Sequence, residues 1–317
     1  MDVAILGVGG VGAYYGGVLA RAGHSVRFWA RGANLDALRR RGLEVRAPEE
    51  TFTVAVTATD VAADLGAVEL AIVAVKSYSL SAVGPAAQAV ASRGATVLPL
   101  LNGVDAAERL ISLGVPRQAL VGGLTFISAE RLAPGVVERK SSFQNIVLGE
   151  LGGGTSSRTE AIVAALRSAS VDARDTPQVD VELWQKFVFI ASLATVCGLA
   201  RTSIGPVRSA PQGGDFIDAA VNEAVAVGRA RGVPLPADQS TRTTAMIQAL
   251  PPQMRPSFLA DLERGGPTEL EALMGAVARM GQEAGVSTPV HSAATAALSA
   301  TLASSPPPTV AGATGRA

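Results

Sequence analysis

The chain has 317 residues with 27 basic and 27 acidic side chains, so its formal net charge is zero. A chain without net positive charge has no overall electrostatic attraction to nucleic acid or to an anionic membrane surface. Apolar residues make up 48% of the chain and charged residues 17%, which excludes disorder for most of it. This length fits one large domain or two ordinary ones.

Cysteine and histidine are rare, which bears on disulfides and metals. Cys197 is the single cysteine, and His24 and His291 are the two histidines. We therefore predict neither a disulfide framework nor a metal site. The start Met1-Asp2 lacks the basic segment of a signal peptide, and the uncharged run Phe187–Ala200 is shorter than the about 20 residues that span a bilayer. We expect a soluble, cytoplasmic protein.

Short apolar runs alternate with helical stretches in the first half of the chain. Strands are predicted at Val3–Leu6, Val26–Trp29, Val68–Val75 and Ala95–Leu100. Helices are predicted at Val11–Ala22, Leu35–Arg40, Leu80–Ala91, Ala106–Leu113 and Arg158–Ser168. This alternation indicates a parallel sheet covered on both faces. Further strand fragments lie near Thr53–Thr57, Leu120–Ile127, Val136–Arg139 and Asn145–Leu148. Their short connections predict an antiparallel edge of the sheet.

The pattern changes after Pro177, where strand signals end. Helices are predicted at Val181–Ala200, Asp215–Arg231, Asp238–Leu250, Thr268–Ala284 and Ser292–Ala303, with breaks at proline-rich points such as Gly205-Pro206. We therefore predict an α/β protein with a Rossmann-type domain over residues 1–177 and an all-helical domain over 178–303. Residues 304–317, rich in Pro, Gly and Ala, are predicted to form a disordered tail.

A glycine-rich turn, Gly7-Val8-Gly9-Gly10-Val11-Gly12, follows the first strand and opens the first helix. The G-x-G-x-x-G spacing falls on Gly7, Gly9 and Gly12. These glycines permit a tight turn, close approach of the backbone to a pyrophosphate, and close packing of helix on strand. The strand–turn–helix setting favours dinucleotide binding over an ordinary turn.

The end of the second strand selects between cofactors. NAD-binding domains tend to carry a carboxylate there, whereas this chain has Arg31. A guanidinium suits a 2′-phosphate, so we predict NADP(H), with a solvated surface arginine as the alternative.

Three lysines occur in the chain, and two have placements that suggest chemistry. Lys76 follows the strand Val68–Val75, as Asn102 follows Ala95–Leu100, and ligands of open α/β sheets lie at these carboxyl ends. An ordinary loop lysine and an Asn-Gly turn are the alternatives. Lys186 begins an otherwise apolar helix, where an ammonium needs a partner or a task. Desolvation would lower its pKa toward that of a general acid, unless the side chain reaches solvent.

The ordered set of motifs resembles the ketopantoate reductase (2-dehydropantoate 2-reductase) family over nearly the whole chain. The matching segments are the glycine turn, Ala30-Arg31-Gly32, Ala74–Ser77, Leu101–Gly103, Leu183–Lys186, Pro256–Phe258 and Pro267–Glu271. The resemblance implies an enzyme of pantothenate biosynthesis with a Rossmann domain and a helical domain like that of 6-phosphogluconate dehydrogenase, with the cleft between them.

The resemblance also implies roles for particular residues. Lys186 would be the general acid, and Ser257 would hold the substrate carboxylate. Asn102 would contact both cofactor and substrate, while Lys76 and Glu269 would lie on the cofactor side.

The chain departs from the family where the substrate is expected. Members with ketopantoate activity usually carry asparagines four and eight residues after the lysine, where this chain has Ile190 and Ala194. Met274 replaces a third asparagine. Because residues at i, i+4 and i+8 share a helix face, that face has become apolar. We predict a 2-keto acid substrate that is more apolar than ketopantoate.

Other classes of protein stay open. A non-catalytic NADP(H) sensor or scaffold would keep the glycine turn and Arg31 but would not need Lys186, Ser257 and Glu269. An opine-type or β-hydroxyacid dehydrogenase would show a His–Asp pair or an asparagine four residues after the lysine, and neither is present. A homodimer is plausible because the long apolar helix calls for a covering surface.

Overall fold

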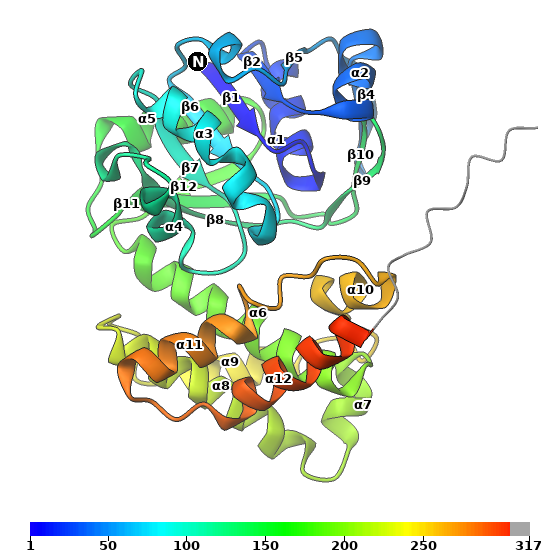
Figure 1. The fold of residues 1–317 in the computed structure, drawn as a ribbon, viewed down its shortest axis with the longest axis vertical. Helices are drawn as coiled ribbons and strands as arrows, with labels where there is room; N and C mark the ends of the chain where they lie inside the picture. Colours follow the sequence, from blue (N-terminus) through cyan, green and yellow to red (C-terminus); the bar gives the residue numbers. More distant parts are fainter. Residues whose placement is uncertain (305–317) are drawn as a thin grey trace, which may run out of the picture. The chain divides into compact units, whose positions relative to one another are not determined.

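The computed structural model describes residues 1–304, and the chain divides into two compact units (Figure 1). The first unit covers Met1–Leu183, and the second begins at Trp184. This boundary lies inside one continuous helix, α6 (Val179–Ala200). The tail predicted for residues 304–317 falls, from residue 305 on, outside the described residues.

The first unit is built on a five-stranded, fully parallel sheet. Its strand order is β5 (Thr57–Thr59), β2 (Ser25–Trp29), β1 (Asp2–Leu6), β6 (Leu70–Val73) and β7 (Thr96–Pro99). Counted along the chain, this is the order 3-2-1-4-5, which is five of the six strands of the 3-2-1-4-5-6 dinucleotide-binding sheet. The strands β6 and β7 are buried along their whole length, which is why they are continuous apolar runs in the sequence.

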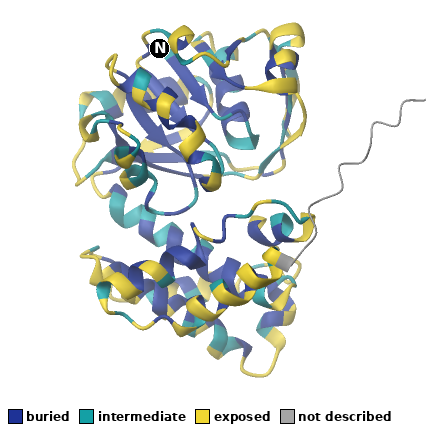
Figure 2. Ribbon diagram, in the orientation of Figure 1, coloured by how far each residue is buried: buried dark blue, intermediate teal, exposed yellow. Residues whose placement is uncertain are grey.

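Helices cover this sheet and create a core on each face. The helices of this unit are α1 (Gly10–Arg21), α2 (Gly32–Arg41), α3 (Leu80–Ala91), α4 (Ala106–Ser112) and α5 (Ser157–Ser168), with short 3₁₀ turns η1 (Ala62–Leu65), η2 (Ser77–Ser79) and η3 (Arg117–Ala119). Of these, α5 packs on the strands β11 and β12 of a smaller sheet described below. Alternate residues of β1 enter different clusters: Val3 and Ile5 pack in one, Ala4 and Leu6 in the other. Figure 2 shows the strands as the buried interior of this unit. The predicted covered parallel sheet is therefore confirmed.

Two smaller sheets complete the first unit. One has the strand order β12 (Asp172–Asp175), β11 (Asn145–Glu150), β8 (Val121–Phe126), with β8 and β11 antiparallel. A single bridge between Val97 of β7 and Leu120, just before β8, links it to the main sheet. The other runs β4 (Thr51–Val54), β3 (Leu43–Arg46), β10 (Val136–Arg139), β9 (Ala129–Ala133). The expectation of a single sheet with an antiparallel edge was therefore wrong for this second group, which forms a sheet of its own.

Beyond residue 184 the described chain contains helices and no strand. After α6 come α7 (Ile204–Ser209), α8 (Gly213–Ala230), α9 (Gln239–Gln248), α10 (Ser257–Arg264), α11 (Met274–Ala284) and α12 (Pro289–Ser304). The predicted all-helical second part is confirmed, with three corrections, the first of which is that α7 and α10 were not predicted. Gly205-Pro206 lies inside the first turn of α7, where a proline costs no hydrogen bond. The helix predicted from Thr268 begins only at Met274, because Leu273 has a non-helical backbone (φ −108°, ψ −96°).

Helix α6 is longer than its uncharged run, at 22 residues. Its length and hydropathy alone would permit it to cross a bilayer. Of the apolar stretch of α6 that could span a membrane, 61% is buried inside the protein. The first turn of the helix carries the acidic residues Asp180 and Glu182. A core helix of a globular unit would show the same burial and the same acidic first turn, so α6 is weak evidence for a membrane span.

Candidate active site

The glycine-rich turn joins β1 to α1, and its three spaced glycines meet different steric demands. Gly7 has φ of +110°, which side chains rarely tolerate. A Cβ atom on Gly12 would overlap the carbonyl oxygen of Gly7. A Cβ atom on Gly9, in contrast, would meet nothing within 4 Å. The open space outside Gly9 is what the approach of a pyrophosphate to the backbone requires.

The first turn of α1 adds an electrostatic preference for an anion. Its N-cap is Gly9, which offers no side chain to the free N–H groups, and no acidic residue lies in the first turn. These N–H groups carry the positive end of the helix dipole. The backbone from Gly7 through Val8, Gly10, Val11 and Gly12 therefore fits the pyrophosphate of a dinucleotide.

Two supports of this turn escaped the sequence analysis. The buried side chain of Asn34 in α2 donates from Nδ2 to the carbonyl of Val8 (3.4 Å) and accepts on Oδ1 from the N–H of Gly135 (2.9 Å). Gly135 lies between β9 and β10. From that same hairpin, Ala129 packs so closely on Gly10 that a Cβ atom there would overlap its carbonyl oxygen. Only one feature of the sequence indicated that Asn34 matters, namely that asparagine is rare in this chain. Its two contacts could not be expected, because the partners are 26 and 101 residues away.

The end of β2 holds a stacked pair. Arg31, exposed at the N-cap position of α2, has its guanidinium carbon 4.3 Å from the ring centroid of Trp29, the last residue of β2. Trp29 is buried, with 8% of its surface exposed. No acidic residue lies in the first turn of α2. Arg31 therefore lies just past the carboxyl end of β2, and the aromatic ring beside it was not predicted.

Lys76 and Asn102 lie at matching positions after neighbouring strands. Val73 of β6 is paired with Pro99 of β7. Lys76 comes three residues after Val73, and Asn102 comes three residues after Pro99. Both are half-buried, and both interact with other groups of the protein. Since β6 also pairs with β1, these loops share the carboxyl edge of the sheet with the glycine turn. The expected grouping of Lys76 and Asn102 at the cofactor edge follows from this topology.

In the helical unit, Lys186 lies on α6 and interacts with Glu269. Burial lowers the pKa of the Lys186 ammonium to about 8, and the negative charge of Glu269 opposes part of this decrease. Glu269 precedes α11 and is 3% exposed. An ammonium with a pKa near neutrality can both give and regain a proton, which an ordinary surface lysine does poorly.

The other predicted residues of the helical unit differ in exposure. Ser257 is the first residue of α10 and is exposed. Ile190 is half-buried, whereas Ala194 and Met274 are buried. The face of α6 that continues from Lys186 is therefore apolar, as the sequence indicated.

The two histidines have partners of their own. His24 is half-buried, and its Nε2 atom lies 2.9 Å from the hydroxyl of Ser168. His291 is fully buried in the first turn of α12 and pairs with Glu223 of α8. No histidine–carboxylate pair was expected from the sequence, so the pair of His291 and Glu223 is a correction to that prediction. Among residues 1–304, no cluster of His, Cys, Asp or Glu could hold a metal ion.

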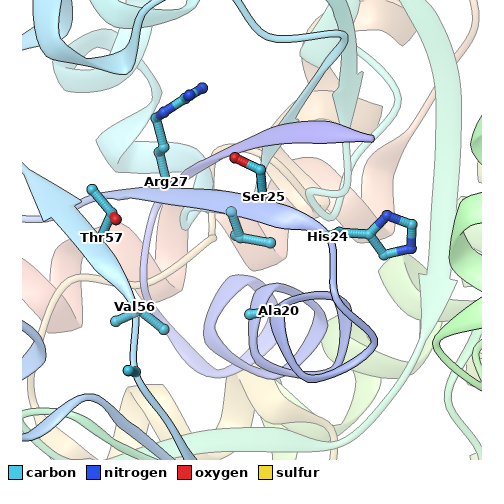
Figure 3. Close-up of a pocket in the computed structure, with 8 residues that line it drawn as sticks. Ala20, His24, Ser25, Arg27, Val56 and Thr57 are labelled. Carbon is cyan, nitrogen blue, oxygen red and sulfur yellow. The ribbon is translucent and has the colours of Figure 1, made fainter.

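A surface hollow in the first unit lies at the wrong edge of the sheet for a Rossmann ligand. It is lined around the start of β2 by Ala20, His24, Ser25, Val26, Arg27, Ala55, Val56 and Thr57. In Figure 3 the side chains of Arg27 and His24 point away from each other, so no polar groups converge there. It carries no functional assignment.

A parallel sheet of this order with a glycine turn, followed by a helical unit, is typical of a dinucleotide-dependent oxidoreductase. Comparison with known families narrows this class. Residues 3–153 match the model of ketopantoate reductase PanE/ApbA, and residues 178–302 match that of its C-terminal domain. The chain belongs to the ketopantoate reductase family.

Individual relatives agree with this family. An oxidoreductase of Bacillus subtilis, YkpB, described as uncharacterised, is 26% identical over 92% of this chain and 95% of its own length. The 2-dehydropantoate 2-reductase of Halobacterium salinarum is 29% identical over 92% of this chain and 95% of its own. The crystal structure of a PanE/ApbA family ketopantoate reductase from Ralstonia eutropha has a TM-score of 0.85 at 27% identity, covering 96% and 99% of the two chains. D-mandelate dehydrogenase, at 19% identity and a TM-score of 0.85, shares the fold.

Proposed function

We propose that this protein is an NADPH-dependent reductase of a small 2-keto acid, with Lys186 as the general acid. The observation that carries the proposal is the ammonium of Lys186, whose pKa burial lowers to about 8 beside the buried carboxylate of Glu269. The position of Lys186 in the ketopantoate reductase motif supports the same role.

The cofactor assignment rests on the first unit. The open space at Gly9 and the uncapped start of α1 suit a pyrophosphate, and Arg31 suits a 2′-phosphate. Lys76 and Asn102, at the same sheet edge, would line the nicotinamide side, with Asn102 also reaching the substrate.

When bound, the reduced nicotinamide supplies the hydride for the keto carbon. Lys186 donates a proton to the carbonyl oxygen as that oxygen becomes an alkoxide, which leaves the lysine neutral until it regains a proton from solvent. Glu269 stabilises the ammonium between turnovers, so the acid is present at neutral pH. Ser257 and the free N–H groups at the start of α10 would hold the substrate carboxylate.

The substrate we propose carries an apolar group where ketopantoate carries its hydroxyl. Ile190, Ala194 and Met274 offer no hydrogen bond at the positions of the family's asparagines. A hydroxyl buried there without a partner costs about 1–3 kcal/mol, whereas a hydrocarbon side chain would gain from the same contact.

The alternative of a non-catalytic sensor explains less. Such a module needs the glycine turn and Arg31, but it has no use for a desolvated lysine facing a buried carboxylate. A homodimer and a cytoplasmic location stay predictions, and light scattering would test the first.

The test is steady-state oxidation of NADPH with a panel of 2-keto acids, from ketopantoate to branched aliphatic and aromatic analogues. We expect an apolar member to reach kcat/KM near 10⁴ M⁻¹s⁻¹ or more, an ordinary value for an enzyme, and ketopantoate to fall at least tenfold below it. A kcat/KM for ketopantoate within tenfold of the best apolar substrate would contradict the altered substrate. No turnover of any 2-keto acid would contradict the enzyme assignment.

A further inference from the structure

A buried tryptophan and an exposed arginine meet at the carboxyl end of β2. The guanidinium of Arg31 stacks on the indole of Trp29 at 4.3 Å, well within the range of a cation–π interaction. We propose that Trp29 is a positioning residue that sets the preference for a 2′-phosphorylated dinucleotide by holding the Arg31 guanidinium in place. This inference rests on the proposed use of NADPH.

Trp29 is well suited to be a fixed platform. In the sheet it is paired with Leu6 of β1 on one side and Thr59 of β5 on the other. Its side chain belongs to the core cluster that also contains Leu65 and Val68. Its indole N–H is buried and has no acceptor among the described residues, so no hydrogen bond within the protein redirects the ring.

Arg31 depends on this platform because little else orders it. It has no ion pair within the described part of the chain, and its side chain does not cap α2. A long, unrestrained arginine loses rotamer freedom when it binds an anion, which weakens binding. A guanidinium already stacked on a rigid ring loses less.

The stacked geometry also leaves the binding groups available. A guanidinium meets an aromatic ring through its flat face, whereas its N–H donors lie in its plane. Arg31 is exposed, so its donors stay available to a ligand, and two of them can bind a phosphate together. NAD has a hydroxyl in place of the 2′-phosphate, so the stack should improve binding of NADP and leave binding of NAD unchanged.

The test measures binding without turnover. Dissociation constants for NADP⁺ and NAD⁺ are determined by titration calorimetry, at one salt concentration, for the parent chain and for Trp29→Leu, Arg31→Leu and the double variant. We expect Arg31→Leu to weaken NADP⁺ binding tenfold or more and Trp29→Leu to weaken it about two- to fivefold, the usual range for a cation–π contact. Neither should change NAD⁺ binding, and in the Arg31→Leu background Trp29→Leu should have no further effect.

A matched control accounts for simple loss of packing. Phe28→Leu removes a buried aromatic ring from the same strand, but its side chain packs in the other core cluster and contacts α1 at Gly16. The ratio of the NADP⁺ and NAD⁺ constants should be unchanged in this variant. If Trp29→Leu folds poorly, Trp29→Phe keeps the core filled and should give a smaller loss in the same direction.

The outcomes separate the two levels of the proposal. If Arg31→Leu leaves NADP⁺ binding intact, the cofactor assignment fails. If Arg31→Leu weakens NADP⁺ binding while Trp29→Leu and Trp29→Phe do not, or weaken both nucleotides equally, the positioning role of Trp29 is overturned and the cofactor assignment stands.

Discussion

The carboxylate of Glu223 on α8 accepts a hydrogen bond of 2.7 Å from Nδ1 of His291, at the start of α12. The same carboxylate accepts from the backbone N–H groups of Val290 (2.7 Å) and His291 (3.0 Å). One buried side chain thus satisfies three donors, two of which belong to the first turn of α12. Glu223 therefore acts as a helix cap supplied from a distant part of the chain.

We expect Glu223→Ala to destabilise the protein by about 3 kcal/mol, because it strands these buried donors. Thermal or denaturant unfolding would measure the loss. Glu283→Ala removes an equally long but half-exposed carboxylate from α11 and should change stability by less than about 0.5 kcal/mol. An equal loss of stability in Glu223→Ala and Glu283→Ala would show that the hydrogen bonds of Glu223 to α12 do not stabilise the protein.

The pH dependence of stability should show the same pair. Burial alone would raise the pKa of Glu223, but the hydrogen bonds from His291 and the two backbone groups outweigh it and hold that pKa below its usual range. A depressed pKa in the folded state gives stability that is present above the unfolded value of about 4.3 and is lost as pH falls through the folded value. The parent should therefore lose more stability than Glu223→Gln between about pH 5 and pH 3 in urea titrations. Parallel curves would contradict this.

Lys186 should determine the pH profile of reduction. The acid form of a group with a pKa of about 8 prevails below that pH, so kcat/KM for reduction should be level near pH 7 and decline above about pH 8. Reverse oxidation, which needs the neutral amine, should rise over the same interval. Lys186→Met should lower kcat by about 10²–10⁴-fold.

Two variants control this prediction. Lys186→Arg keeps a positive charge but is a poor acid, so it should be as slow as Lys186→Met and show no decline near pH 8. Lys140→Met removes an exposed lysine that pairs with Glu130, and it should behave as the parent does. A profile unchanged in Lys186→Met would exclude its role as the acid.

The glycines of the turn should separate binding from folding. Gly9→Ala places a Cβ atom in open space, so stability should hold while the Kd for NADP⁺ rises tenfold or more, because the methyl group occupies pyrophosphate space. Gly12→Ala forces a clash with the carbonyl of Gly7 and should lower the melting temperature as well. Calorimetry and thermal unfolding on both variants would check this contrast. Tight binding by Gly9→Ala would place the phosphates elsewhere.

The local elements of the Rossmann unit could be predicted because their signals are local. β1, the glycine turn and α1 follow one another within 20 residues, and α3 and β10 have the predicted bounds. The strands β3, β9 and β12 escaped prediction because their sequences, LEVR, AERLA and DARD, lack an apolar run. β3 pairs with β4 in a local hairpin and with β10, more than 90 residues later, and the second partner could not be seen in the local sequence.

The candidate site was predictable to the same degree. Lys186 and Arg31 could be identified because each is a charge in an unusual local setting. Asn34 could not, since its role depends on partners that the fold brings together, and the same holds for the Glu223–His291 pair outside the site. Trp29 is only two residues from Arg31, but the sequence does not show that its ring lies against the guanidinium. Asn34, for example, joins residues 8 and 135, and no spacing pattern in the chain indicates that contact.

Ile190 offers a test of substrate selection. Ile190→Asn restores a hydrogen-bonding side chain at a half-buried position, one helical turn from Lys186. We expect kcat/KM for ketopantoate to rise by about tenfold or less, as one hydrogen bond to the substrate permits, while values for apolar 2-keto acids fall. Ile190→Leu, which keeps volume and polarity, should leave the ratio of the two substrates unchanged. A fall on every substrate with Ile190→Asn would show that the residue does not select between them.

Asn34 should affect both nicotinamide dinucleotides alike, in contrast to Trp29 and Arg31. Asn34→Ala leaves the buried N–H of Gly135 without its acceptor and frees the carbonyl of Val8, so stability should fall by about 1–3 kcal/mol. NADP⁺ and NAD⁺ share the pyrophosphate, for which we propose the glycine turn as the binding site, so their dissociation constants should rise by the same factor. Asn222→Ala, at an exposed position of α8, is the matched control and should change neither stability nor binding. Loss of NADP⁺ binding alone in Asn34→Ala would mean that this side chain acts on the 2′-phosphate and not through the turn.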